Sequence, residues 1–460
     1  MVFSSITFLF YFLPCILTLY FFSKNTWKNL VLVIGSLFFY AWGEPIYVIL
    51  MIFSTIVDYS LGRFLSYAQL RKNIVLAKVC LFASVTINLS LLIIFKYSDL
   101  FLLTFNSVFH TTFSPLSLAL PIGISFYTFQ TMSYTIDVYR QKVPAQKNFL
   151  EFATYVTLFP QLIAGPIVRY ETIAKELGNR KENLEAGIPL FIIGLSQKVL
   201  LANNIGLAFE EYQSGIILNP SLLSSWFLIF CYAMQIFFDF AGYSNMAIGL
   251  GLMFGFHFPI NFNKPYLATS ISNFWQRWHI SLTTWFKEYV YIPLGGNRTG
   301  TFLTIRNIFT VWLLTGIWHG ASWNFLFWGL YFALILTLEK FFILHLLKKL
   351  PIICSYLYTV IFLTIGWVLF AFESFSQIQT YFTYLLGANG FIDQSFYFLL
   401  LNYGIIALLC VLASTHLIRT IFLRLCRWEL IKTFLYLMLF LASLAYIVDN
   451  SYDPFLYFRF

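Results

Sequence analysis

Two histidines in the stretch from about residue 230 to 325 are the side chains of this sequence best suited to acid–base chemistry. His319 stands in LTGIWHGASWNFLFWG, residues 314–329, and His279 stands in SNFWQRWHISLTTWFKEYVYIPLGGNR, residues 272–298. An unperturbed imidazole has a pKa near 6.5, so it can take a proton from a hydroxyl at neutral pH. His319 is therefore a candidate general base. The alternative for His279 is a hydrogen-bonded side chain at the bilayer edge.

Other polar side chains of this tract are candidates for contact with a substrate. Gln235 and Asp239 in QIFFDFAGYSNMAIG are four residues apart, so they share a helix face that Tyr243 continues. Asp239 could instead pair with a basic or hydroxyl partner on a neighbouring helix. The Pro-Leu-Gly-Gly-Asn-Arg turn could offer backbone N–H groups and a guanidinium to a phosphate. The full set of candidate substrate-binding residues is Gln235, Asp239, Arg277, Arg298, Trp318 and Asn324.

The composition places these residues in a membrane protein. Of the 460 residues, 60% are hydrophobic and only 10% are charged, whereas a soluble domain has about 25% charged residues. Ionisable groups are costly at membrane depth, so the polar tract is where a functional site is expected. The net charge of +9 does not indicate nucleic acid, because excess Lys and Arg in a polytopic protein mark cytoplasmic loops. The six cysteines are scattered and suggest neither disulfides nor a metal site.

Apolar runs of about 20 residues predict the membrane spans. Basic residues cluster in alternate loops, which predicts that these loops are cytoplasmic and that both termini lie on the opposite face. The loops that contain Lys147 and Lys340 are both predicted to be cytoplasmic, so an even number of membrane spans must lie between them. The number is even only if residues 149–168 form one span, yet Pro160 and Pro166 would break a helix there. We expect that segment to be re-entrant. The predicted spans are residues 2–22, 29–43, 45–65, 76–96, 117–138, 186–207, 222–240, 242–257, 305–319, 323–343, 355–372, 396–416 and 431–448.

Two further patterns predict how the polar tract is positioned. Large side chains recur at helical spacing in residues 272–298, which indicates an amphipathic helix at an interface. They are Phe274, Trp278, Leu282, Trp285 and Tyr289. Gly316 and Gly320 form a small-x-x-x-small face that would let another helix approach closely beside His319.

The sequence resembles the membrane-bound O-acyltransferases (MBOAT), in the bacterial branch that O-acetylates alginate or peptidoglycan or D-alanylates teichoic acid. The resemblance rests on residues 235–298, on FPQLIAGPIVRY at residues 159–170 and on the WHG tripeptide. It implies an all-α fold of about 11–13 transmembrane helices, with re-entrant or interfacial helices around a central funnel. It also implies one domain over residues 1–460, with the polar catalytic tract at 230–325. The WHG histidine is the essential residue of the family and corresponds to His319. The usual second functional histidine corresponds to His279.

Three positions depart from what the resemblance leads us to expect. Asn245 and Asn273 stand where an acidic residue is expected, and His257 stands where a basic one is expected. These departures put the salt bridges of those positions in doubt, and with them the substrate that the cavity prefers.

The C-terminal tail, residues 449–460, is predicted to be extracytoplasmic. Its residues FLYFRF are similar to a C-terminal F-x-Y-x-x-F motif by which a small partner protein of the D-alanylation system presents a tyrosine to its acyltransferase. Tyr457 would then accept the acyl group. An aromatic anchor at the membrane interface is the alternative reading.

These observations predict an O-acyltransferase of the bacterial cytoplasmic (inner) membrane. It would move an acetyl group from acetyl-CoA, used as a substrate and not as a permanently bound cofactor, to a hydroxyl reached from the other face. His319 would act as general base, and His279 would position the donor or stabilise the oxyanion. Besides the lipid bilayer, we expect an extracytoplasmic esterase-like (SGNH-like) acetyltransferase partner that O-acetylates peptidoglycan. The alternatives are O-acetylation of alginate or another exopolysaccharide, D-alanylation of teichoic acid, a polytopic transporter or flippase, and a structural subunit.

Overall fold

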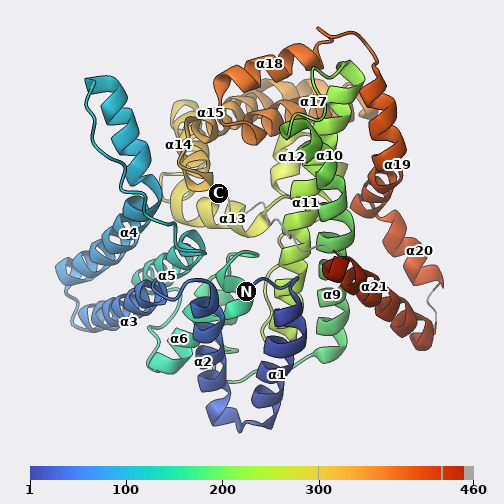
Figure 1. Cartoon of the computed structure of the whole chain (residues 1–460). Helices are drawn as coiled ribbons and strands as arrows, with labels where there is room; N and C mark the ends of the chain where they lie inside the picture. The colour runs from blue at the N-terminus through green and yellow to red at the C-terminus, as the bar shows by residue number, and fades with distance from the viewer. Residues whose placement is uncertain (299, 426–427, 450–460) are drawn as a thin grey trace. The chain divides into compact units, whose positions relative to one another are not determined.

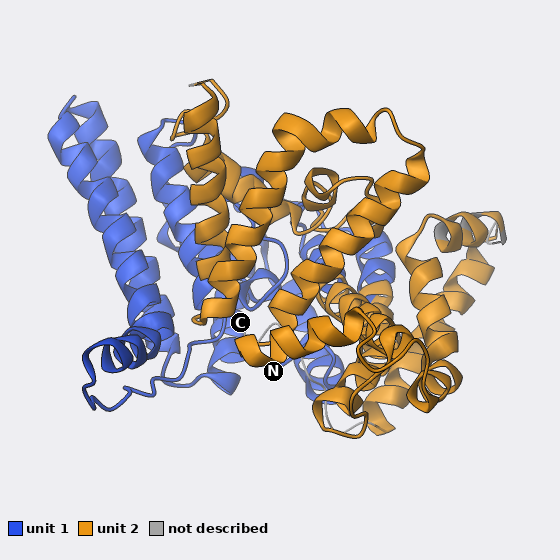
Figure 2. Cartoon of the chain, turned by 90° about the horizontal axis from the view of Figure 1, so that it is seen from above, with its two compact units in different colours: residues 1–191, 244–259 blue, residues 192–243, 260–460 orange. Residues whose placement is uncertain are grey.

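The computed structural model describes residues 1–298, 300–425 and 428–449, and every regular element in these ranges is a helix (Figure 1). By contacts the chain divides into two compact units, coloured separately in Figure 2. Unit 1 is Met1–Phe191 with Ser244–Pro259, and unit 2 is Ile192–Tyr243 with Ile260–Phe460. The one domain over residues 1–460 that the sequence suggests stays a prediction.

Unit 1 holds the N-terminal helices. They are η1 (Thr7–Phe12), α1 (Leu13–Phe22), α2 (Asn25–Gly43), α3 (Val48–Leu70), α4 (Ile74–Phe109), α5 (Ile124–Tyr139), α6 (Phe149–Thr157), α7 (Phe159–Leu162) and α8 (Tyr170–Ile173). Helices α9 (Leu184–Ser196) and α11 (Leu222–Met253) have residues in both units.

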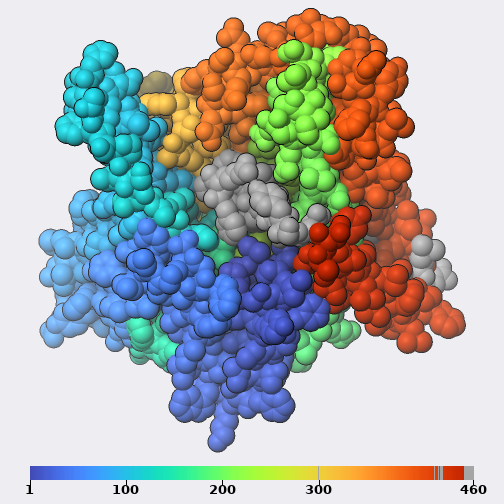
Figure 3. Space-filling view, in the orientation of Figure 1, coloured from blue at the N-terminus to red at the C-terminus, as the bar shows by residue number. Residues whose placement is uncertain are grey.

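Unit 2 holds both candidate histidines. Its helices are η2 (Gln197–Ala202), α10 (Asn203–Gln213), η3 (Pro265–Leu267), α12 (Ile271–Trp275), α13 (Ile280–Phe286), η4 (Lys287–Tyr291), α14 (Thr301–His319), α15 (Trp323–Leu338), η5 (Glu339–Ile343), α16 (Leu344–Leu347), α17 (Ile352–Ala371), α18 (Phe375–Leu385), α19 (Gln394–Ser414), α20 (Leu417–Leu425) and α21 (Glu429–Asp449). Helices α10 and α19 adjoin in Figure 3, and the Tyr403 hydroxyl of α19 donates a hydrogen bond of 2.7 Å to Glu211 of α10.

Nine helices in the described part of the chain are long and apolar enough to cross a bilayer. This confirms the prediction of an all-α, multi-pass membrane protein. They comprise α3, α4, the continuous run Leu184–Gln213, α11, α14, the run Trp323–Leu347, α17, α19 and α21. The predicted division of residues 222–257 into two spans is wrong, because α11 is one helix of 32 residues. Most of α11 is buried in protein, so its length is not limited by the thickness of the bilayer.

The segment predicted to break at its prolines does break. Helix α6 ends at Thr157, α7 covers only Phe159–Leu162, and an irregular chain follows. Phe152, Phe159 and Leu162 are fully buried within unit 1. Irregular backbone at membrane depth is tolerated where protein covers it, and this segment meets that condition. Its re-entrant course through the bilayer stays a prediction.

Unit 1 also contains a buried carboxylate that sequence reasoning did not single out. Asp58 on α3 accepts hydrogen bonds from Ser84 (2.6 Å) and Asn88 (2.8 Å), both on α4. Thr131 of α5 donates to Asn88 at 3.1 Å. Buried polar groups persist when their hydrogen bonds are satisfied, and these bonds fasten α3, α4 and α5 to one another.

Candidate active site

A close helical hairpin positions His319. Helix α14 ends at His319, and α15 returns beside it after a short turn (Figure 1). A Cβ added to Gly316 would lie 2.3 Å from the Phe325 carbonyl oxygen, and one added to Gly329 would lie 2.4 Å from that of Trp312. Only glycine permits this approach of the two backbones, which confirms the small-residue face predicted at Gly316. Gly320 differs, because it caps the helix and faces the Phe325 ring.

Aromatic rings enclose the His319 imidazole. Its ring centroid lies 5.1 Å from that of Trp318, 5.0 Å from that of Trp328 and 5.3 Å from that of Phe370, all at steep interplanar angles. His319 is 5% exposed. Such packing restricts the rotamer of the imidazole and excludes water, which strengthens electrostatic interactions with a bound reactant.

His279 lies at a break in the segment predicted to be one amphipathic helix. Helix α12 ends at Trp275 and α13 begins at Ile280, so the prediction of a continuous helix is wrong. The predicted stripe is nevertheless buried at every position. His279 has φ 44° and ψ 55°, in the left-handed region that L residues other than glycine, asparagine and aspartate rarely adopt. Strained backbone of this kind is concentrated at functional sites.

The break forms because residues 261–263 hydrogen-bond to the segment between the two helices. The backbone N–H of Ile280 donates to the Asn261 carbonyl oxygen at 2.9 Å, and that of Asn263 donates to the Arg277 carbonyl oxygen at 2.9 Å. The side chain of Asn261 adds a bond of 3.0 Å between its Oδ1 and Nδ1 of His279. These tertiary bonds replace helical bonds between α12 and α13 and hold His279 at the break.

The two histidines lie on either side of one indole. Trp318 is in ring contact with His319 and, at 5.9 Å between centroids, with His279. His279 is 2% exposed and lies outside the nine candidate spans. Its pKa is well below the ordinary value, because burial disfavours the charged ring and, secondarily, because His319 acts on it electrostatically. Among the described residues no hydrogen-bond partner reaches Nε2 of His279. The site can therefore present a neutral imidazole to a reactant.

A buried glutamate that sequence reasoning missed supports this arrangement. Glu339, the first residue of η5, is fully buried. Its carboxylate accepts the backbone N–H of Ile271 at 2.6 Å and that of Ser272 at 2.7 Å, at the start of α12. A carboxylate at a helix N-terminus satisfies N–H groups that have no partner within the helix. Glu339 thereby fixes the short helix that leads to His279.

Asp239 forms the ion pair that was one of its two predicted roles. Its Oδ1 lies 2.7 Å from Nζ of Lys198 in η2, and the side chains are 2% and 3% exposed. Nζ of Lys198 also donates to Asn203 at 2.8 Å. The pairing with a basic residue on a neighbouring helix is confirmed, whereas contact of Asp239 with substrate stays a prediction.

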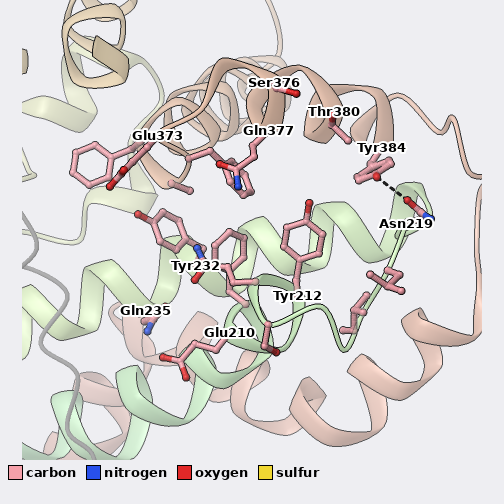
Figure 4. Close-up of a pocket in the computed structure, with 18 of the residues that line it drawn as sticks. Glu210, Tyr212, Asn219, Tyr232, Gln235, Glu373, Ser376, Gln377, Thr380 and Tyr384 are labelled. Atoms are coloured by element: carbon pink, nitrogen blue, oxygen red, sulfur yellow. Dashed lines mark hydrogen bonds between the residues drawn. The ribbon is translucent and has the colours of Figure 1, made fainter. Parts of the chain in front are cut away.

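A cavity of about 860 Å³ lies in unit 2 between α10, α11, α17 and α18. Figure 4 shows Tyr232, Gln235 and Glu210 on one wall and Glu373 and Gln377 on the other. Aromatic, amide, hydroxyl and carboxylate groups line it, and no Lys or Arg is among its described lining residues. The lining includes Phe370, whose ring contacts the His319 imidazole. The Phe370 side chain would therefore lie between His319 and a polar ligand in this cavity.

The remaining predicted site residues differ in their surroundings. Asn324 is fully buried and donates to the Leu369 carbonyl oxygen at 3.2 Å. Arg277 donates to Asn273 at 3.1 Å, beside the break at His279. Arg298 is exposed, at the turn that was considered for phosphate binding. Tyr457 lies outside the described residues.

Asn273 and His257, which depart from the expected pattern, each have a polar contact. Asn273 accepts the hydrogen bond from Arg277 that an acidic residue would accept as a salt bridge. Nδ1 of His257 lies 2.7 Å from Oε1 of Glu176, in unit 1.

A sequence model of the membrane-bound O-acyltransferase family matches residues 90–369. This range contains His279, His319 and the cavity-lining residues of α10, α11 and α15, whereas those from Phe370 to Tyr384 lie beyond it.

The chain is also similar to named bacterial proteins. It is 39% identical over 381 residues to "Probable alginate O-acetylase AlgI" of Pseudomonas aeruginosa, covering 81% of this chain and 72% of that protein. It is 35% identical over 429 residues to the peptidoglycan O-acetyltransferase of Helicobacter pylori, covering 85% and 80%. It is 31% identical over 234 residues to the teichoic acid D-alanyltransferase of Bacillus subtilis, covering 48% and 59%.

Proposed function

The chain belongs to the membrane-bound O-acyltransferase family, and from this premise we propose that it transfers an acetyl group from acetyl-CoA to a hydroxyl on the far side of the cytoplasmic membrane. The observation that carries the proposal is the pair of buried imidazoles, His279 and His319, on either side of Trp318. Acyl transfer from a thioester to a hydroxyl needs a proton acceptor and a proton donor, and it needs no metal ion.

His319 is the general base of the proposed reaction. Its imidazole takes the proton of the attacking hydroxyl as the oxygen forms a bond to the thioester carbonyl carbon. The carbon–sulfur bond then breaks, and the proton passes to the departing thiolate, which leaves as CoA thiol. His279 positions the thioester donor. The surrounding rings of Trp328 and Phe370 support this role, because they keep water from hydrolysing the thioester.

The acceptor enters from the cavity beside His319. The basic loops assign Glu373 to an extracytoplasmic loop, so the cavity opens on the face opposite to the CoA donor. Glu210 and Glu373 in the lining disfavour a polyanion, whereas amides, hydroxyls and aromatic rings suit a sugar or a phenol. The similarity to the peptidoglycan O-acetyltransferase of Helicobacter pylori supports peptidoglycan as the final acceptor. The similarity to alginate O-acetylases keeps alginate as the second candidate.

Tyr457 is the first acceptor in this proposal. Its phenol attacks the thioester, giving acetyl-Tyr457 and CoA thiol, and an extracytoplasmic esterase-like partner then moves the acetyl group to a glycan hydroxyl and restores the phenol. The partner's own hydrolase-like chemistry would perform that second step. Acetyl transfer and membrane crossing thereby become one event, because CoA remains in the cytoplasm.

Vesicles with the protein in one orientation test the proposed function. Acetyl-CoA on the cytoplasmic face should acetylate each chain once without any added acceptor. It should turn over repeatedly only when the partner and a glycan acceptor are present on the other face, and free CoA should appear on the side of the donor. Movement of an acceptor glycan without any thioester would instead favour a transporter. Reaction with a D-alanyl carrier-protein thioester, but not with acetyl-CoA, would favour teichoic acid D-alanylation.

Tyr457→Phe removes one oxygen atom and should abolish a covalent intermediate. Intact-protein mass spectrometry after incubation with acetyl-CoA should show an acetyl adduct on the wild-type chain and none on this variant. Tyr446→Phe, on α21, is the matched control and should retain the adduct. Unchanged transfer to glycan by the Tyr457→Phe variant would place the acceptor elsewhere and leave the tail as an interfacial anchor.

A further inference from the structure

The hydrogen bonds around Asn261 fix which nitrogen of His279 carries the proton. The backbone N–H of Ser281 can only donate, and it points to Oδ1 of Asn261 at 3.3 Å. The Ser281 hydroxyl donates to the same atom at 2.8 Å. This atom is therefore the amide oxygen, an acceptor, so its bond of 3.0 Å to Nδ1 of His279 requires a proton on Nδ1.

With the proton on Nδ1, the neutral ring has its lone pair on Nε2. Nε2 is buried, and no described residue donates a hydrogen bond to it. The ring is also held against rotation. The Phe240 ring stands perpendicular to it at 4.7 Å, and the Phe262 ring lies nearly parallel at 6.5 Å. A fixed, buried acceptor without a partner is unusual, because burying such a group without a hydrogen bond is unfavourable.

We propose that Asn261 is a positioning residue that holds His279 in the Nδ1–H form, so that Nε2 accepts a hydrogen bond from an N–H or O–H group of a substrate. The inference rests on the acetyl transfer proposed above. It selects donor positioning from the two roles considered for His279, because a neutral ring in this form has no proton on Nε2 to give to an oxyanion. The hydrogen donor is an amide N–H of the pantetheine arm, because the single proton of the acceptor hydroxyl goes to His319.

The pH dependence follows from the groups around His279. An accepting Nε2 must be unprotonated, so activity falls as pH drops through the pKa of His279. Burial keeps that pKa low, which keeps the acid limb of the pH profile at low pH. The charged or titratable groups on the segments next to it are His319 on α14, Asp239 on α11 in its ion pair with Lys198, and Lys264 and Arg277 on the flanking segments.

Asn261→Asp tests the proposal with almost no change of shape. Its carboxylate would stabilise the imidazolium and raise the pKa of His279, so the acid limb of kcat should move upward by about one pH unit or more, with activity retained at high pH. Asn261→Ala should lower kcat at least tenfold at every pH without that shift. Asn263→Asp, which adds the same charge two residues away on an exposed position, is the matched control and should leave the limb in place.

Two further measurements separate the possible outcomes. Nitrogen-15 NMR of histidine-labelled wild-type protein, with a His279→Gln difference spectrum to isolate one of the six histidines, should show a protonated Nδ1 and an unprotonated Nε2. This readout does not depend on activity, so it distinguishes failure of the inference from failure of the proposed function. In Asn261→Ala, a raised KM for acetyl-CoA supports the pantetheine amide as the hydrogen donor, and a raised KM for the acceptor alone contradicts it. A protonated Nε2, or an unmoved acid limb in folded Asn261→Asp, overturns the proposal.

Discussion

Replacing His319 with alanine should lower acetyl transfer by about 10²- to 10⁴-fold, the range that loss of a general base produces. The residue touches the three aromatic rings of Trp318, Trp328 and Phe370. It is the group that would take the hydroxyl proton. Binding of acetyl-CoA should survive, because the variant removes proton transfer and leaves the neighbouring rings in place. The measurement is CoA release from reconstituted vesicles, with donor binding measured separately.

His345→Ala is the matched control for this result. His345 on α16 is exposed and belongs to the same unit, so its loss should leave both folding and transfer unchanged. His319→Gln keeps much of the volume of the imidazole and should be as inactive as the alanine variant. Full activity in either His319 variant would remove the residue from the mechanism. Inactivity together with lost donor binding would indicate a collapsed site.

Sequence reasoning succeeded where the information was local or compositional. The glycine contact at Gly316 and the break near Pro160 depend on residue type and short spacing, and each is visible without tertiary contacts. The membrane character followed from the low share of charged residues. The same local reasoning predicted that α11 would be two spans, because it assumed that each apolar helix must match the bilayer.

The residues that sequence reasoning missed act through long-range contacts. Asn261 interrupts the predicted helix from 18 residues away, and helical periodicity contains no information about such a bond. Glu339 lies next to Lys340 at the end of an apolar run, where a glutamate is normally read as a membrane boundary, yet it caps α12. Lys198 was taken as part of an ordinary span. In each case a charged or amide group inside an apolar context was the available signal.

Asp239→Asn should destabilise the protein by about 3–5 kcal/mol, because it leaves the Lys198 ammonium buried and unpaired. The pair is 2.7 Å long, and both side chains are almost completely buried. The substitution changes shape very little, so the loss reflects charge and not packing. Thermal unfolding of purified protein in detergent or nanodiscs should show a clearly lowered Tm. Glu429→Gln, which breaks an exposed ion pair with Lys432 on α21, is the control and should stay within about 1 kcal/mol.

Removing both charges should restore most of the lost stability. Replacement of a buried ion pair by apolar residues of similar volume is often neutral, because the desolvation penalty of two ions disappears with their attraction. The double variant Lys198→Met with Asp239→Leu should therefore unfold close to the wild type. Equal destabilisation of the double and single variants would mean that further polar partners, such as Asn203, need the charges.

Activity of the stable double variant then decides between the two roles of Asp239. If the carboxylate only balances Lys198, a chain that folds without either charge should transfer acetyl at a rate within a few-fold of the wild type. If Asp239 contacts substrate, the double variant should be folded and slow, with a raised KM or a lowered kcat. We expect the first outcome, because the two charges form a buried ion pair at 2.7 Å and Asn203 takes a hydrogen bond from the ammonium. A folded but inactive double variant would move Asp239 from the scaffold into the active site.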